Sequence, residues 1–446
     1  MTIPVTTGDR LELPLLAGEK WWGGAVADGQ AMPMGASAHR RNLATSAGFL
    51  DDDTAGANQS APLLVSSRGR YVWSESPFEF AFDGAGGLVV AGNELVLGRA
   101  EATLGGAFRA AAAAHFPAAG RTVATPMLAA PQYNTWIEMP YRPTQDAVLA
   151  YVRGLLDAGF PPGVVMIDDR WSVDYGDWRF DRTRFPDPTA MARTLHAWGC
   201  AVMLWLVPFV SPDSENFRAL EAGGSLVRRP DGSPAIRRWW NGYSAVLDLT
   251  SPEAVGWLRA RLDALVDDGV DGFKFDAGDL RDYRTDDVTA GGTGPVGQCE
   301  AWARIGLGYR FNEFRACWKM GGQPLASPWR VLDGEHLAAV LAAVDLHQAL
   351  VPEIIALARH AARTGEPILR PLAYAHRGYE DVSDQFLLGS DLLCAPVLAR
   401  DAGSRHVVVP PGRWRGADGH VTEGPAEVEV AVTLASVPLW RREHAG

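Results

Sequence analysis

Short apolar runs separated by turn residues dominate the first 125 or so positions of the chain. Glycine, aspartate and asparagine lie between these runs, which have the length of β-strands. The clearest runs cover residues 63–65, 71–73, 78–82, 88–90 and 95–97. This spacing predicts an N-terminal β-sandwich over residues 1–125, and an alanine-rich run predicts a helix at 107–114.

The pattern changes near residue 130, where strand-like runs begin to alternate with amphipathic helices. Strands are predicted at 132–138, 164–168, 201–207 and 272–276. The intervening segments carry helix-start signals, which are Thr144 as a cap, Pro188 at a helix start, and Ser251 followed by a proline. Repeated strand–helix units of roughly 30 residues predict an α/β fold with a parallel sheet. A closed (β/α)8 TIM-type barrel and an open doubly wound sheet both fit this pattern, but no Gly-x-Gly-x-x-Gly follows these strands, which disfavours dinucleotide binding.

The C-terminal part returns to short alternating runs with proline and glycine turns, for example at 407–409 and 428–432. These runs predict a small all-β domain. The predicted domains are therefore the sandwich at 1–125, a barrel at 126–375 and the C-terminal β domain at 376–446.

Composition narrows the function classes. The 446 residues carry a formal net charge of −12, whereas nucleic-acid-binding proteins usually present a basic surface. We find no signal peptide and no run of about 18 apolar residues, so we predict a cytoplasmic protein without a membrane span. The four cysteines are far apart and have no histidine at metal-ligand spacing, so we expect no metal and no cofactor.

Acidic residues recur where the predicted barrel strands end. Asp168 and Asp169 end one strand, and Asp276 ends another. Barrel enzymes place their active-site groups at this end of the strands. Lys274 lies two positions before Asp276, so both side chains face the same side of the strand. A nearby lysine favours an ionised carboxylate, which is what a glycosidic nucleophile must be.

Tryptophans accompany these carboxylates. The chain has sixteen, and several lie at or just beyond the predicted strand ends. Those near the acidic residues are Trp136, Trp171, Trp178, Trp205, Trp239 and Trp240. Flat apolar rings beside carboxylates suit a small carbohydrate better than a phosphate, and we see no glycine-rich phosphate loop.

Four segments, taken in order, resemble glycoside hydrolase family 31. They cover residues 131–138, 165–171, 239–242 and 273–279, and they contain the runs Ile-Asp-Asp, Trp-Trp-Asn-Gly and Lys-Phe-Asp. The chain is most similar to the branch whose nucleophile lies in a Lys-Phe-Asp motif, and the order of sandwich, barrel and β domain also matches the family.

The resemblance implies a retaining α-glycosidase that acts on a terminal non-reducing glucoside, galactoside or xyloside. Asp276 falls on the family's nucleophile. Asp168 falls on the carboxylate that binds hydroxyls of the terminal sugar, and Asp169 shares that work. Trp205, Trp240 and Lys274 fall where the family lines its pocket.

A retaining enzyme also needs a second carboxyl group about 5 to 5.5 Å from the nucleophile. The family supplies it from a loop after the sixth strand, and no segment here resembles that loop. Residues 312–325 resemble the fifth-strand region, but 327–333 resemble a segment that normally follows the seventh strand. A helix predicted at 335–364 leaves no strand candidate before 367–372, which resembles the eighth strand. We therefore predict an incomplete barrel without strands 6 and 7.

Three other acids could replace the missing group by chemistry alone, although each fits a structural role better: Asp279, Asp333 and Glu335. Three functions stay open. The first is an α-glycosidase. The second is an impaired or inactive carbohydrate-binding homologue that lacks the acid/base residue. The third is a different barrel hydrolase that uses Asp168, Asp169 and Asp276 as metal ligands.

Overall fold

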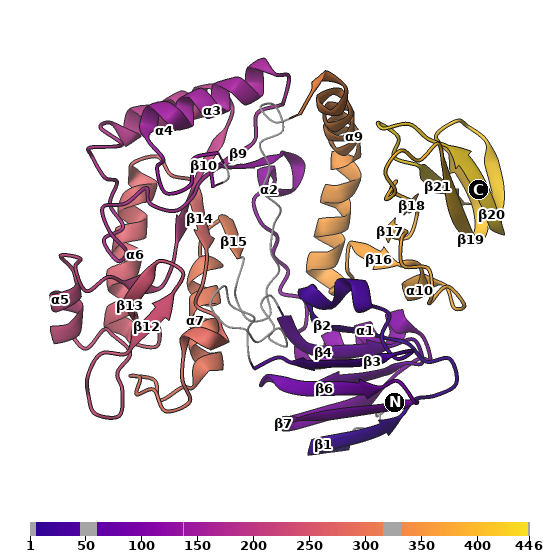
Figure 1. Cartoon of the computed structure of the whole chain (residues 1–446), viewed down its shortest axis with the longest axis horizontal. Helices are drawn as coiled ribbons and strands as arrows, with labels where there is room; N and C mark the ends of the chain where they lie inside the picture. Colours follow the sequence, from indigo (N-terminus) through magenta and orange to yellow (C-terminus); the bar gives the residue numbers. More distant parts are fainter. Residues whose placement is uncertain (1–5, 45–59, 137, 315–331, 445–446) are drawn as a thin grey trace.

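The computed structural model describes residues 6–44, 60–136, 138–314 and 332–444. These residues form an N-terminal antiparallel sheet, a parallel sheet with helices, and a C-terminal antiparallel sheet (Figure 1). In that view the long helix α9 (Gly334–Thr364) stands between the parallel sheet and the C-terminal sheet.

The N-terminal region is β-rich, as predicted. Its strands are β1 (Thr6–Pro14), β2 (Trp21–Ala25), β3 (Ala38–Asn42), β4 (Ser60–Ser66), β5 (Arg70–Trp73), β6 (Phe78–Asp83) and β7 (Gly87–Arg99). They are joined in one seven-stranded sheet, because β7 pairs with β1, β5 and β6. The runs predicted at 88–90 and 95–97 are thus two halves of one strand. Leu64 faces the main core, whereas Leu63 and Val65 pack on the face covered by α1 (Leu104–His115).

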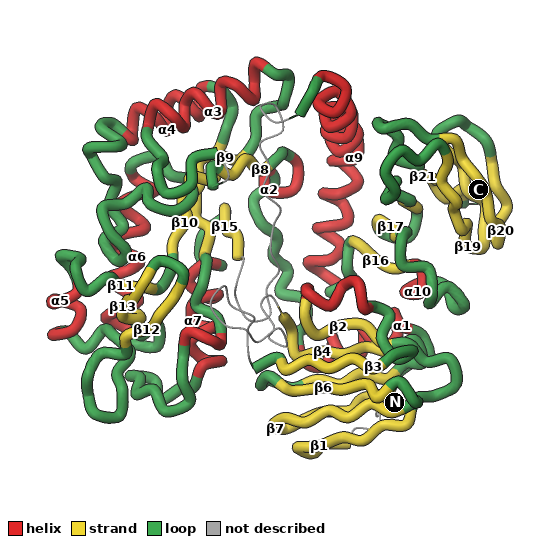
Figure 2. Tube along the Cα trace, viewed as in Figure 1, coloured by secondary structure: helices red, strands yellow, loops and turns green. Residues whose placement is uncertain are grey.

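Five parallel strands form the middle sheet (Figure 2). They are β8 (Gln132–Asn134), β9 (Val164–Ile167), β10 (Ala201–Leu206), β14 (Gly272–Phe275) and β15 (Phe311–Phe314). Their spatial order, β15-β14-β10-β9-β8, is the reverse of the chain order, so each strand pairs with its neighbour in sequence. This is the succession expected of a (β/α) barrel, and it excludes the doubly wound alternative, in which the strand order reverses at a switch point.

Three of the helices of this sheet begin where the sequence predicts, and the fourth, at Pro295–Gly306, was not predicted. These helices are α3 (Gln145–Asp157), α4 (Pro188–Ala197), α6 (Pro252–Asp267) and α7 (Pro295–Gly306). The Thr144 hydroxyl accepts a hydrogen bond from the Ala147 amide at 3.2 Å, and the Ser251 hydroxyl accepts one from the Ala254 amide at 3.3 Å. Each cap satisfies an amide that has no partner within its helix.

A small antiparallel sheet and several short helices complete this part of the chain. The sheet contains β11 (Phe209–Val210), β12 (Ile236–Trp239) and β13 (Gly242–Val246), and it follows β10 directly. The short helices of the described chain are η1 (Val26–Ala31), α2 (Pro126–Ala129), α5 (Phe217–Ala222), η2 (Leu280–Asp282) and α10 (Leu372–Ala375).

The parallel sheet is an incomplete barrel within the described residues, as predicted. A complete barrel has eight strands, and five are joined here. The proposed break in the family pattern falls largely at 315–331, which lies outside the described residues. The predicted helix at 335–364 corresponds to α9.

The prediction of an eighth barrel strand at 367–372 is wrong for the described structure. A strand, β16 (Leu369–Pro371), does form there, but it pairs antiparallel with β17 (Phe386–Leu388) in the C-terminal sheet. Leu369 is 61% exposed, whereas barrel strands are buried on both faces. A short apolar run carries no information about which sheet it joins, so the sequence pattern could not distinguish the two outcomes.

The C-terminal sheet has six strands in the order β16-β17-β18-β21-β19-β20. Its remaining strands are β18 (Leu392–Cys394), β19 (Ser404–Gly416), β20 (Val421–Ala431) and β21 (Leu439–Glu443). The core of this sheet is separate from the main core and is built around Trp414 and Trp440.

Helix α9 is long and apolar enough to cross a membrane by length and composition alone, and none of its most apolar 18-residue stretch is fully buried. Its first turns nevertheless pack against the main core through Leu337, Val340 and Leu341. Further along, Gln348 Nε2 donates to the Ala129 carbonyl at 2.8 Å, and Glu353 pairs with Arg441 at 2.8 Å. These contacts connect α9 both to α2 and to the C-terminal sheet.

Candidate active site

The parallel sheet places four polar side chains in one row. Lys274 on β14 is in register with Trp205 on β10 and with Glu313 on β15. Asp168 follows the last paired residue of β9 by one position and extends the row to a fourth strand. Residues in register on parallel strands point to the same face of the sheet, so the row faces one side. This row (Asp168, Trp205, Lys274 and Glu313) is the floor of the candidate site.

Lys274 is the centre of the row. Its side chain is 3% exposed, and its ammonium donates to Asp168 Oδ2 at 2.7 Å and lies 3.9 Å from Asp276 Oδ2. Asn134 Nδ2 also donates to Asp168 Oδ2, at 2.9 Å. Burial lowers the pKa of Lys274, but the negative charges of Asp168, Asp276 and Glu313 raise it by more, so the net shift is upward. The ammonium therefore stays charged inside the sheet.

Asp276 is the first residue beyond β14, at the carboxyl end of the strand. It is 2% exposed, and the Trp205 indole donates to its Oδ2 at 2.7 Å. The Ala277 amide donates to Oδ1 at 2.8 Å. Ala277 has φ of 51°, in the left-handed region, so the chain turns away immediately after the carboxylate. Two N–H donors and one ammonium thus face a carboxylate at the strand end, an environment suited to an anionic nucleophile.

Asp169 lies beside Asp168 but has different partners. The Tyr175 hydroxyl donates to its Oδ1 at 3.0 Å, and Asn241 Nδ2 donates to its Oδ2 at 2.6 Å. Burial raises the pKa of Asp169 to about 7, although the hydrogen bonds from Asn241 and Tyr175 oppose this shift. Two adjacent carboxyl groups therefore have unlike environments, since Asp168 is paired with an ammonium and Asp169 only with neutral donors.

The raised pKa of Asp169 predicts a measurable pH dependence. A carboxyl group whose pKa is higher in the folded state stabilises the fold fully below its unfolded pKa of about 3.9 and loses that contribution as pH rises through about 7. In Asp169→Asn this dependence should vanish. Urea unfolding of both proteins at intervals between pH 4.5 and 8 should show wild type losing stability relative to the variant as pH rises. Parallel curves would exclude the shift.

Trp240 and Asn241 lie at an open cavity beside Asp169, to which Asn241 donates a hydrogen bond. This cavity, of about 530 Å³, is lined by Tyr141, Arg142, Arg170, Tyr175, Trp240 and Asn241. Tyr175 connects this cavity to the row, because its ring centroid lies 6.2 Å from that of Trp205. The structure therefore brings together all six residues that the sequence singles out for the site: Asp168, Asp169, Trp205, Trp240, Lys274 and Asp276.

Sequence reasoning missed four contributors to the site. Asn134, Tyr175 and Asn241 hold the two adjacent carboxylates, and Glu313 is the last member of the row. Asn134 and Asn241 lie within the family-like segments, which was an available signal. Tyr175 lies in a loop, and Glu313 could be placed only by the register of β15 against β14.

The three alternative acids have structural roles. Asp333 caps α9 by accepting from the His336 amide at 2.9 Å, and Glu335 is an exposed residue of the first turn of that helix. Asp279 caps η2 and is buried beside Asp282. Burial and then the neighbouring charge of Asp282 raise the pKa of Asp279. The charge of Asp276 raises the pKa of Asp279 further, so Asp279 is the one of the three that, within the described residues, interacts electrostatically with the Asp276 carboxylate.

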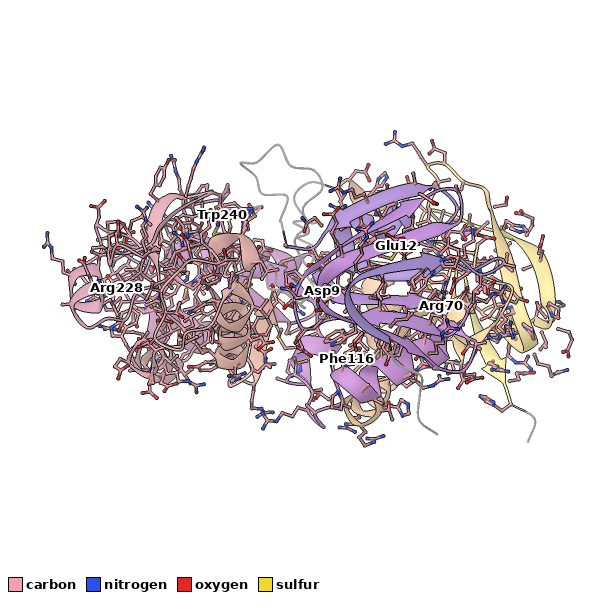
Figure 3. The ribbon with its side chains drawn as sticks, turned by 90° about the horizontal axis from the view of Figure 1, so that it is seen from below. Asp9, Glu12, Arg70, Phe116, Arg228 and Trp240 are labelled. Atoms are coloured by element: carbon pink, nitrogen blue, oxygen red, sulfur yellow. The ribbon has the colours of Figure 1, made fainter. Side chains whose placement is uncertain are left out.

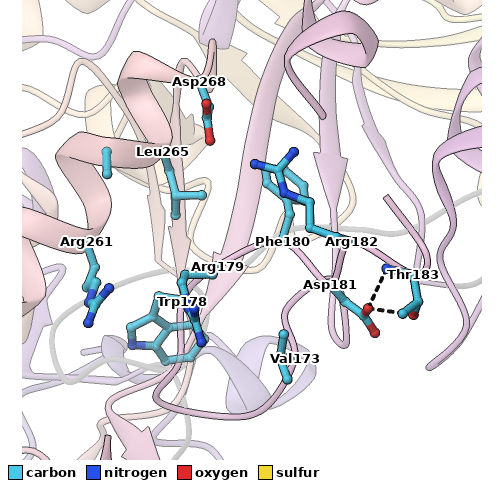
Figure 4. A pocket seen from close by; sticks show the side chains of 11 residues that line it. Val173, Trp178, Arg179, Phe180, Asp181, Arg182, Thr183, Arg261, Leu265 and Asp268 are labelled. Atoms are coloured by element: carbon cyan, nitrogen blue, oxygen red, sulfur yellow. Dashed lines mark hydrogen bonds between the residues drawn. The ribbon is translucent and has the colours of Figure 1, made fainter. Parts of the chain in front are cut away.

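A second cavity, of about 630 Å³, lies outside this site between the loop after β9 and helix α6 (Figure 4). Its lining includes Phe180, Arg182 and Leu265, and Asp181 there accepts from the amide and hydroxyl of Thr183. None of the residues that line it belongs to the row.

A metal centre does not fit the carboxylates of the site. Lys274 Nζ occupies the position between Asp168 and Asp276, and an ammonium there would repel a cation. Across the described ranges, no group of three or more histidine, cysteine, aspartate or glutamate side chains has metal-ligand geometry. The position of Lys274 between two of the three aspartates therefore disfavours a metal-dependent hydrolase at this site.

Comparisons with known proteins agree with this geometry. Residues 125–302 match the TIM-barrel domain of glycosyl hydrolases family 31, and residues 365–445 match the C-terminal domain of the same family. The chain is 27% identical to the myogenesis-regulating glycosidase of Mus musculus, over 69% of this chain and 55% of that protein. It is 24% identical to the alpha-xylosidase XylQ of Lactiplantibacillus pentosus, over 63% of this chain and 49% of the relative.

The chain thus spans about half the length of these curated relatives. Among solved structures, the GH31 dextranase of Flavobacterium johnsoniae complexed with glucose has a TM-score of 0.82 at 17% identity, covering 97% of this chain and 66% of the dextranase. At that identity the likeness supports the fold. Together the two family matches cover more than half of the sequence, and the chain belongs to glycosyl hydrolase family 31.

Proposed function

We propose that this chain is a retaining α-glycosidase with Asp276 as its nucleophile, acting on a terminal α-linked glucose, galactose or xylose. The observation that carries the proposal is the Asp276 carboxylate itself. It stands at the end of β14, receives the Trp205 N–H at 2.7 Å and adjoins the ammonium of Lys274. The names of the relatives, a glycosidase, an α-xylosidase and a dextranase, support an α-linked sugar as substrate.

The reaction would proceed by double displacement. Asp276 attacks the anomeric carbon, the bond to the leaving oxygen breaks, and a glycosyl ester forms on the carboxylate. Water then attacks the same carbon and releases the sugar with its original α configuration, returning the carboxylate to its anionic form. Asp168, which accepts hydrogen bonds from Lys274 and Asn134, would accept further hydrogen bonds from hydroxyls of the bound sugar.

Protonation of the leaving oxygen is the step without an assigned residue. General-acid catalysis typically raises the reaction rate about 10²–10⁴-fold, so glycosides with a poor leaving group should react slowly without it. An aryl leaving group needs little such help. The five-stranded sheet also favours a second candidate function, a carbohydrate-binding homologue with little or no turnover.

One panel of substrates separates the two functions. We expect the purified chain to release 4-nitrophenol from the α-glucoside, α-galactoside or α-xyloside, with the α-anomer of the sugar as the first product seen by NMR. A chelator should not change the rate. If none of the three is cleaved but calorimetry detects binding of the free monosaccharide, the binding homologue is the correct assignment. If a β-anomer appears first, the retaining mechanism is wrong.

A further inference from the structure

Two arginines line the cavity beside Asp169, and within the described residues neither lies at salt-bridge distance from a carboxylate, although the charge of Arg170 lowers the pKa of Asp169. Arg142 and Arg170 both line it, and both are exposed. Among the residues that the structure describes, neither arginine forms a salt bridge, whereas the nearby Arg184 pairs with Asp181 at 2.8 Å. Two guanidinium groups at one cavity without a salt-bridge partner leave donors available to a ligand.

Arg170 is held at the cavity by its surroundings. Its φ is 69°, a backbone conformation that non-glycine residues rarely adopt, and the Arg184 side chain donates to its carbonyl oxygen. Its guanidinium carbon lies 5.6 Å from the ring centroid of Tyr175, which itself lines the cavity. The main chain of Arg170 is therefore held by Arg184, and its side chain packs on Tyr175 at the cavity.

The neighbouring acids offset this positive charge only in part, because the charge of Arg170 acts on Asp169 but no salt bridge forms within the described residues. Asp168 is neutralised by the ammonium of Lys274 at 2.7 Å. Because burial raises the pKa of Asp169 to about 7, that group is protonated in a large fraction of molecules near neutral pH. The chain as a whole carries a net charge of −12. The positive charge at this cavity is therefore opposite in sign to the net charge of the protein.

We propose that this cavity binds an oxyanion carried by the glycoside, a carboxylate, sulfate or phosphate group, with Arg142 and Arg170 as its ligands. Guanidinium groups bind such planar or tetrahedral oxyanions through paired charge-assisted hydrogen bonds. Trp240 and Tyr175 provide ring faces beside them, and Asn241 adds an amide. Trp240 lies on the part of the molecule distant from Asp9, Glu12 and Arg70 of the N-terminal sheet (Figure 3). The proposal rests on the proposed function, since it specifies the substrate class of the same site.

The anion could be carried by the sugar or by its aglycone, and three ligands distinguish these sources. They are 4-nitrophenyl α-glucoside, which is neutral, 4-carboxyphenyl α-glucoside, with an anionic aglycone, and 4-nitrophenyl α-glucuronide, with an anionic sugar. Binding is measured by calorimetry on wild type, Arg142→Gln, Arg170→Gln and, as control, Arg377→Gln. Arg377 is exposed and lies outside the cavity.

We expect one anionic ligand to bind at least about tenfold more tightly than the neutral glucoside, the effect of one charge-assisted hydrogen bond. This advantage should disappear in both cavity variants, persist in Arg377→Gln and shrink as salt is raised. If the neutral glucoside binds equally well or better, the inference fails while the proposed function stands. If an anionic ligand has the advantage but no glycoside is cleaved, the proposed function fails and the inference stands. If no ligand binds, both fail.

Discussion

Replacing Asp276 by alanine is expected to lower the rate of aryl α-glycoside hydrolysis by roughly 10⁴-fold or more, the scale seen when hydrolases lose their nucleophile. The reason is that no other described carboxylate stands at the end of β14 with the Trp205 N–H at 2.7 Å. The alanine variant should recover activity in the presence of azide, because the small anion can enter the space left by the carboxylate. The product would then be a β-glycosyl azide.

Asp286→Ala is a suitable control for this experiment. Asp286 is an exposed aspartate ten positions further along the chain, and its loss should leave the rate unchanged. Binding of the glycoside to Asp276→Ala should persist, since Asp168 and Lys274 are retained. A variant that keeps more than a few per cent of the wild-type rate without azide would show that Asp276 is not the nucleophile.

Replacing Lys274 by methionine is expected to cost about 3–5 kcal/mol of the free energy of unfolding, the usual cost of leaving a buried charge without its partner. Lys274 is 2% exposed and stands between the carboxylates of Asp168 and Asp276. Because the pKa of this lysine is raised in the folded state, its contribution is fully present below about pH 10.4 and is lost only as pH rises through the higher folded value.

Urea unfolding at pH 7 measures this loss directly. The matched control is Lys20→Met, because Lys20 pairs at 3.1 Å with Asp381, whose side chain is 84% exposed, and an ion pair with such a solvated partner contributes at most about 1 kcal/mol. Lys274→Met should also bind the substrate poorly, since Asp168 loses its ammonium partner. Equal stabilities for the two methionine variants would contradict the central role of Lys274 in the row.

The sequence predicted the local elements and the composition of the site more completely than their long-range arrangement. Helix starts at Thr144 and Ser251 depend on a cap within a few residues, so they were readable from the chain. Lys274 and Asp276 could be placed on one side of a strand because side chains alternate along it. The place of Glu313 beside Lys274 depends instead on the register between two strands about forty residues apart, which no local pattern specifies.

The antiparallel pairing of β16 was missed for a related physical reason. A three-residue strand can pair with any free edge, and the choice is made by the surrounding packing rather than by its own residues. The loop that positions Tyr175 against Asp169 was also unreadable, because irregular backbone has no periodicity.

The order of the parallel sheet has a consequence for how the site is assembled during folding. Strands β8, β9, β10, β14 and β15 each pair with the next strand of the same sheet, so these pairings need no segment from either terminal sheet. Each pairing closes a loop that lies between β8 and β15, so the sheet is a contiguous unit of the chain. The row from Asp168 to Glu313 lies wholly within that unit. Its four side chains are therefore brought together by the pairing of these strands alone, without a contribution from the C-terminal strands.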